Sequence, residues 1–175
     1  MTTRTIIQNN NFARLTIIIS SIFIMRSCIH DTAYDQYRHV PENGWTIKDT
    51  LTYIVQLDSI QQNYFLSIET RNRGDYPYND IYLKVMNNAR DSTRFETDTL
   101  KLVLGTKVNR HSEWLGTGIS NLYQMTHRYR SMTLPKRKGN IIFKILPVMR
   151  DHALIGMSDI GLKLSTSAPH QYEGK

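Results

Sequence analysis

The chain has very little cysteine, no long apolar run and no clustered metal ligands. Among its 175 residues there is one cysteine, Cys28, so the chain cannot form an internal disulfide or offer a metal a second thiolate. The six histidines are scattered and form no His-x-x-x-His pair or comparable spacing. The apolar run 15–25 spans eleven residues, whereas a membrane-spanning helix needs about 20. We therefore predict no metal site and no ordinary transmembrane helix.

Acidic residues are missing from residues 1–27, which hold three of the 22 basic residues. The formal charge of +7 therefore falls to 19 − 15 = +4 for the rest of the chain. Such a modest excess suits an anionic membrane surface or an acidic partner. The compact basic cluster at 135–139 is bordered by Pro and Gly and indicates a solvated turn, so we expect no nucleic-acid binding.

Residue types that could carry catalysis are present without a catalytic arrangement. His111, Ser112 and Glu113 are neighbours, and neighbours on a strand point to opposite faces, so they cannot form a triad. Residues 116–118 lack the following helix and lysine of a phosphate-binding loop. Glu96 and Asp98 would share a strand face, which is more simply a solvated face. We expect no enzymatic activity and no cofactor.

The N-terminus has a basic start, then the apolar run 15–25, then Ser27 and Cys28. This order is typical of a secretory signal, and a cysteine directly after a small residue is typical of a lipoprotein signal. We predict that residues 1–27 are a cleaved signal peptide and that lipid is attached to Cys28 through a thioether. Two or more acyl chains make such an anchor effectively permanent. The alternative is a buried helix with an inert cysteine.

After Cys28 the pattern is that of a β-protein. Residues 28–48 lack apolar periodicity and are predicted to form a tether and the lead-in to the domain. Residues 49–166 alternate apolar and polar side chains between turn signals, which predicts an all-β fold, an antiparallel β-sandwich with jelly-roll order as one option. Residues 167–175 are predicted to be a disordered tail. The expected strands are 50–57, 63–70, 81–86, 94–104, 118–130, 140–147 and 159–166.

Four aromatic residues in connecting segments are the candidate contact residues: Trp45, Tyr76, Tyr78 and Trp114. Each lies beside Gly, Pro or Asn, or close to one, in a segment expected to be a loop. Exposed rings on loops can stack on sugars or anchor a protein partner. The alternative is that these rings cap the two open ends of the sandwich.

Several short strings occur in one order along the chain: residues 34–37, 44–45, 71–72, 76–80, 97–100, 114–118 and 155–161. With them the chain resembles the gliding-motility lipoprotein family called GldH, over nearly all of the segment after Cys28. The resemblance implies a membrane-tethered, non-enzymatic component that works with other gliding-motility lipoproteins and with the type IX secretion machinery. It also implies that Cys28 is the acylated residue.

The residues directly after Cys28 bear on which side of the membrane the domain faces. Residues 29–32 contain no run of acids of the kind that directs such lipoproteins to the cell surface, so we expect a cell-envelope protein that faces the periplasm. The functional alternative is a periplasmic glycan-binding accessory protein that uses Trp45 and Trp114 as stacking platforms.

Overall fold

The structure is a computed structural model that describes residues 31–56, 62–108, 111–134, 140–149 and 152–168. This part of the chain contains strands and no helix long and apolar enough to cross a membrane. The strands are β1 Thr32–His39, β2 Leu51–Val55, β3 Gln62–Arg73, β4 Asp80–Asn87, β5 Glu96–Val103, β6 Gly105–Val108, β7 His111–Trp114, β8 Thr117–Ile119, β9 Leu122–Leu134, β10 Ile141–Pro147 and β11 Met157–Ser165.

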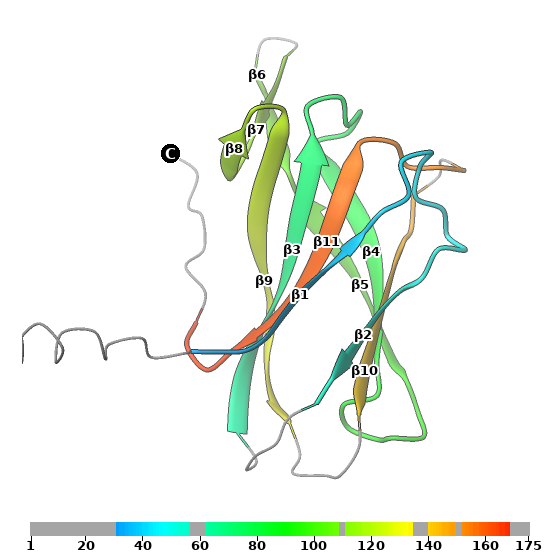
Figure 1. Cartoon of the computed structure of the whole chain (residues 1–175), viewed down its shortest axis with the longest axis vertical. Helices are drawn as coiled ribbons and strands as arrows, with labels where there is room; N and C mark the ends of the chain where they lie inside the picture. Colours follow the sequence, from blue (N-terminus) through cyan, green and yellow to red (C-terminus); the bar gives the residue numbers. More distant parts are fainter. Residues whose placement is uncertain (1–30, 57–61, 109–110, 135–139, 150–151, 169–175) are drawn as a thin grey trace, which may run out of the picture. The chain divides into compact units, whose positions relative to one another are not determined.

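The strands form two antiparallel sheets in jelly-roll order (Figure 1). The larger sheet has the order β1-β11-β3-β9-β8 and the smaller sheet the order β2-β10-β4-β5. Four nested pairs explain this order, because β4 pairs with β5, β3 with β9, β2 with β10 and β1 with β11. A long hairpin with these pairs, rolled up on itself, gives the two Greek keys of a jelly roll. The β6–β7 hairpin and β8 lie within the connection between β5 and β9.

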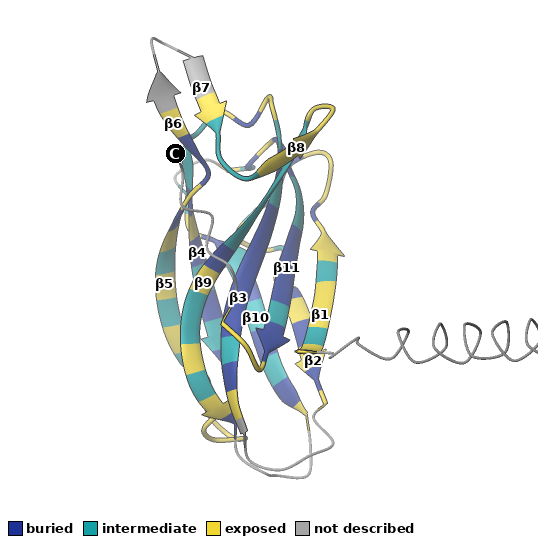
Figure 2. Ribbon diagram, turned by 90° about the vertical axis from the view of Figure 1, so that its left-hand side faces the viewer, coloured by how far each residue is buried: buried dark blue, intermediate teal, exposed yellow. Residues whose placement is uncertain are grey.

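Alternation along the strands builds the core between the sheets. In β4, Ile81, Leu83 and Val85 are buried while their neighbours are more exposed, and β10 repeats the pattern. Exposed residues alternate with less exposed ones along β5 as well (Figure 2). Because successive side chains on a strand point to opposite faces, this period fixes which face of each sheet packs inward.

Two of the polar side chains buried between the sheets, Tyr53 and His127, have partners there. The Tyr53 hydroxyl, on β2, donates to the Ile160 carbonyl of β11 at 2.7 Å, which ties one sheet to the other. His127 on β9 is 9% exposed and its Nε2 lies 3.1 Å from Thr70 Oγ1 on β3. Burial lowers the pKa of His127 to about 4, so its imidazole is neutral in the folded protein at pH 7.

The predicted all-β sandwich is confirmed, and each expected strand segment overlaps an observed one. The tether prediction is wrong for β1, which pairs along its length with β11 and forms an edge of the larger sheet. Val40 and Trp45, in the same segment, are buried in the core. The signal peptide 1–27 and Cys28 lie outside the described residues, as does the predicted tail 167–175 apart from its first two residues.

Candidate functional site

Polar side chains gather on the outer face of the larger sheet, where the register aligns them in rows across four strands. One row is His39, Asp159, Arg71 and Gln124, taken from β1, β11, β3 and β9 in that order. The next row, two residues along, is Tyr37, Gly161, Glu69 and Thr126. Directly opposed side chains in a sheet lie close enough to interact. We call this group the outer-face cluster: Tyr37, His39, Glu69, Arg71, Gln124, Thr126 and Asp159.

Glu69 lies at the centre of the outer-face cluster. Its side chain points out of the sheet, yet the residue is only 4% exposed. The Tyr37 hydroxyl donates to one carboxylate oxygen and the Thr126 hydroxyl donates to the other at 3.2 Å. Burial and the adjoining carboxylate raise the pKa of the Tyr37 phenol above its ordinary value, so Tyr37 remains a donor at neutral pH. Glu69 thereby fixes an edge strand to the sheet centre.

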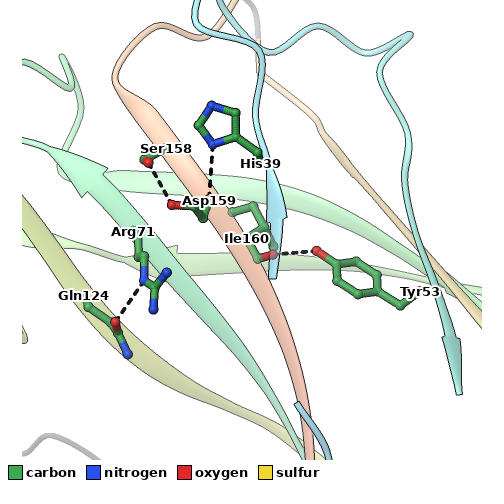
Figure 3. A network of polar contacts seen from close by, with 7 residues as sticks. All are labelled: His39, Tyr53, Arg71, Gln124, Ser158, Asp159 and Ile160. Atoms are coloured by element: carbon green, nitrogen blue, oxygen red, sulfur yellow. Dashed lines mark hydrogen bonds and ion pairs between the residues drawn. The ribbon is translucent and has the colours of Figure 1, made fainter. Parts of the chain in front are cut away.

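The Arg71 side chain lies over the Tyr37 ring, whose hydroxyl binds Glu69. Its guanidinium carbon lies 3.7 Å from the centre of the Tyr37 ring, a cation–π distance, and its Nε donates to Gln124 Oε1 at 2.9 Å (Figure 3). The ring and the amide come from strands on opposite sides of β3. The guanidinium is therefore held in position by contacts with β1 and β9 on either side of its own strand.

A hydroxyl, a carboxylate and an imidazole also meet in the cluster, in an order that does not suit hydrolysis. Ser158 Oγ donates to Asp159 Oδ2 at 2.7 Å, and His39 Nδ1 lies 3.2 Å from Asp159 Oδ1 (Figure 3). The carboxylate is in the middle, whereas a catalytic triad needs the imidazole between carboxylate and hydroxyl to take the proton of the nucleophile. These contacts orient the His39 and Ser158 side chains toward the Asp159 carboxylate of β11. The described residues contain no group of three His, Cys, Asp or Glu side chains that could hold a metal ion.

Gly161 makes room for the cluster. A Cβ atom at this position would lie 2.9 Å from Cε1 of the Tyr37 ring and 3.1 Å from Glu69 Cβ. Both distances are shorter than ordinary van der Waals contact, so a side chain here would push the ring away from Glu69. The glycine thus lets the Tyr37 ring lie flat across β11.

A third row continues the pattern toward the other end of the strands. Asp35, Lys163, Ser67 and Arg128 are opposed across β1, β11, β3 and β9. Lys163 Nζ lies 3.8 Å from Asp35 Oδ2, and the Arg128 guanidinium lies 5.3 Å from the centre of the Phe65 ring. Burial and the nearby Glu69 carboxylate raise the pKa of Asp35, although Lys163 opposes this effect. Acidic and basic groups therefore alternate on this face and compensate one another.

Three of the four aromatic candidates meet at one end of the sandwich. The Tyr76 ring centre lies 5.9 Å from that of Tyr78 and 6.2 Å from that of Trp114, and Trp114 lies 5.9 Å from Tyr123. Tyr76 is 3% exposed, and Tyr78 and Trp114 are partly buried against the core. Trp114 is the last residue of β7, so these rings pack together at the base of the β6–β7 hairpin. Tyr123 is not among the aromatic candidates from sequence; it lies in β9, paired with Gly118 of β8, and its ring reaches Trp114.

Trp45 does not present its ring to solvent. It is 1% exposed, its backbone forms an isolated bridge with Leu154, and its indole Nε1 donates to the Asp49 carbonyl at 2.7 Å. A buried indole has no face available to a sugar, and neither Trp45 nor Tyr76, which is 3% exposed, presents an exposed ring on a loop. The glycan alternative, which required Trp45 as a stacking platform, loses its main residue.

Comparison with known proteins gives a consistent result. A family model described as GldH lipoprotein matches residues 32–164. A protein of Christiangramia forsetii named "Gliding motility lipoprotein GldH homolog" is 29% identical over 160 residues, covering 86% of this chain and 94% of that protein. A Flavobacterium johnsoniae protein named "Gliding motility lipoprotein GldH" is 22% identical over 155 residues, covering 85% and 93%. No solved structure matches.

Proposed function

Because this chain belongs to the GldH lipoprotein family, we propose that it is a non-enzymatic structural and interaction component of gliding motility and of the associated type IX secretion machinery. Lipid on Cys28 anchors it to a membrane, and the sandwich faces the periplasm. The observation that carries the proposal is the family match from residue 32, which begins four residues after Cys28. The relatives' names, which join lipoprotein with gliding motility, support the same role.

The outer-face cluster supports an interaction role over a catalytic one. Its polar atoms bind one another: Tyr37 and Thr126 donate to Glu69, and Arg71 donates to Gln124. Side chains that are already fixed lose little conformational entropy on binding, and Arg and Tyr are common centres of protein–protein interfaces. We assign the contact with other motility lipoproteins or secretion components to this face.

A pull-down from detergent-solubilised native membranes tests the role. Wild-type protein is expected to recover motility lipoproteins or type IX secretion components, identified by mass spectrometry. Arg71→Glu should reduce this recovery, since it removes the stack on Tyr37 and places a carboxylate beside Glu69. Arg90→Glu, which changes an exposed charge in the β4–β5 connection, is the matched control and should leave recovery unchanged.

Two outcomes would contradict the proposal. One is that wild-type protein recovers no motility or secretion component in several detergents. The other is that Arg71→Glu, shown by circular dichroism to be folded, recovers the same components in the same amounts as wild type, which would remove the outer-face cluster as the contact surface.

A further inference from the structure

The two outer faces of the sandwich differ in chemistry. Eight large apolar side chains are exposed among the described residues, and five of them belong to the smaller sheet or its rim. These five are Ile54 on β2, Tyr82 on β4, Val103 on β5, Phe95 directly before β5 and Val148 directly after β10. Exposed apolar side chains gathered on one face mark an interaction surface more often than scattered ones do.

Lysines lie among these apolar groups. At the outward positions of β4, β5 and β10 are Lys84, Lys101 and Lys144. The Lys144 ammonium lies 4.9 Å from the Phe95 ring centre, and the Lys101 ammonium lies 5.6 Å from the Tyr82 ring centre. The outward acid on these described strands is Asp80, whose carboxylate is paired with Lys101 at 2.9 Å. We call this surface the basic face.

The opposite face does not share this character. The outer face of the larger sheet carries Asp35, Glu69 and Asp159 among its basic residues, so its charges are balanced. An anionic surface would therefore be attracted more strongly by the basic face than by this charge-balanced face. Two copies of the chain joined through their basic faces would oppose lysine to lysine, which disfavours a dimer of this kind.

The short segment between Cys28 and β1 favours a membrane over an acidic protein as the partner of the basic face. Three residues separate Cys28 from Thr32, the first residue of β1. An extended chain covers at most about 3.6 Å per residue, so the Cα of Cys28 lies within about 14 Å of that of Thr32. With lipid on Cys28, a membrane surface is therefore always beside the sandwich, at a high effective concentration.

We infer that the basic face of the smaller sheet rests on an anionic phospholipid surface, with Lys84 and Lys144 at the headgroups and the apolar side chains at the interface. Long lysine side chains can keep their stems on apolar surface while the ammonium meets a phosphate. The outer-face cluster then points away from the membrane, toward soluble and membrane-associated partners. This inference rests on the proposed Cys28 anchor.

The test uses the full protein, purified from its native membranes and reconstituted into vesicles. Because Cys28 is the one cysteine and is acylated in the proposal, a second cysteine is the single free thiol. Thr99→Cys places a fluorophore on the basic face, and Ser131→Cys places it at an exposed position on the larger sheet. Quenching by spin-labelled headgroups is then compared in vesicles of phosphatidylcholine alone and of equal parts phosphatidylcholine and phosphatidylglycerol.

We expect the Thr99 probe to be quenched more strongly than the Ser131 probe, and only when phosphatidylglycerol is present. Salt at 1 M should weaken the difference, since it shortens the screening length to about 3 Å. With about 1 kcal/mol per lysine near an anionic surface, Lys84→Glu with Lys144→Glu should lower the docked-to-undocked ratio at least about 30-fold. Arg128→Glu, on the opposite face, should not lower it.

Equal quenching of the two probes, with one labelled thiol per chain, overturns the docking inference alone and leaves the basic face to an acidic protein partner. Two labelled thiols per chain show that Cys28 is unacylated, which overturns the anchor and the docking together. Retained quenching in the folded double lysine variant also overturns the inference.

Discussion

Protonation of the unfolded chain at His127 is expected to weaken the fold in mild acid. The buried imidazole has a pKa of about 4, compared with 6.5 for an unperturbed histidine, and burial is the cause. Between these two values the unfolded state binds a proton that the folded state does not. Stability is therefore constant with respect to His127 above pH 6.5 and falls as the pH decreases. At 1.36 kcal/mol per pKa unit, the loss is about 1.4 kcal/mol at pH 5.5 and about 3 kcal/mol at pH 4.

His127→Gln removes the titration while keeping an amide within reach of Thr70 Oγ1. Urea unfolding followed by the fluorescence of the two tryptophans, of which Trp45 is buried, measures the effect at pH 7.5, 6.5 and 5.5. The free energy of unfolding of wild type should fall relative to the variant by about 1.4 kcal/mol over this range. Parallel pH curves for the two proteins would refute the reasoning, because they would show that His127 has the same pKa folded and unfolded.

Three substitutions test the packing. Gly161→Ala should displace the Tyr37 ring and lower stability by about 1–3 kcal/mol in thermal unfolding, as overpacking does, and a wild-type melting temperature would contradict the close approach. Tyr53→Phe should cost about 1 kcal/mol in urea unfolding, since it removes the hydrogen bond between the sheets. Trp45→Ala should cost about 3–5 kcal/mol, whereas Ile119→Ala at an 80% exposed position should cost little; equal losses would show that Trp45 is not in the core.

Strands with one apolar face could be predicted from sequence, and the edge strand β1 could not. Ile81, Leu83 and Val85 alternate with less buried residues because β4 lies inside the smaller sheet with one face on the core. β1 has a neighbour on one side only, and its outward side chains join a polar network, so its sequence shows no apolar period. Its pairing depends on β11, more than 100 residues away.

The outer-face cluster could not be predicted because it depends on register. Glu69 and Asp159 fall in two separate expected strands, 63–70 and 159–166, but only the pairing of β11 with β3 places Asp159 opposite Arg71. The aromatic candidates show a second limit of prediction from sequence. The sequence pattern places Tyr76 and Trp114 in connecting segments, with a cap on the sandwich end as the alternative, whereas Trp114 is the last residue of β7 and its ring packs beside that of Tyr76.

Mass spectrometry of the protein from its native membranes tests the central claim, the lipid anchor on Cys28, most directly. Cells are labelled with a clickable fatty acid, and wild type is compared with Cys28→Ala. We predict a wild-type chain that begins at an acylated Cys28 and a variant without lipid. A wild-type chain that keeps residues 1–27 and carries no lipid would contradict the anchor, and with it the proposed place of this protein in the gliding-motility machinery.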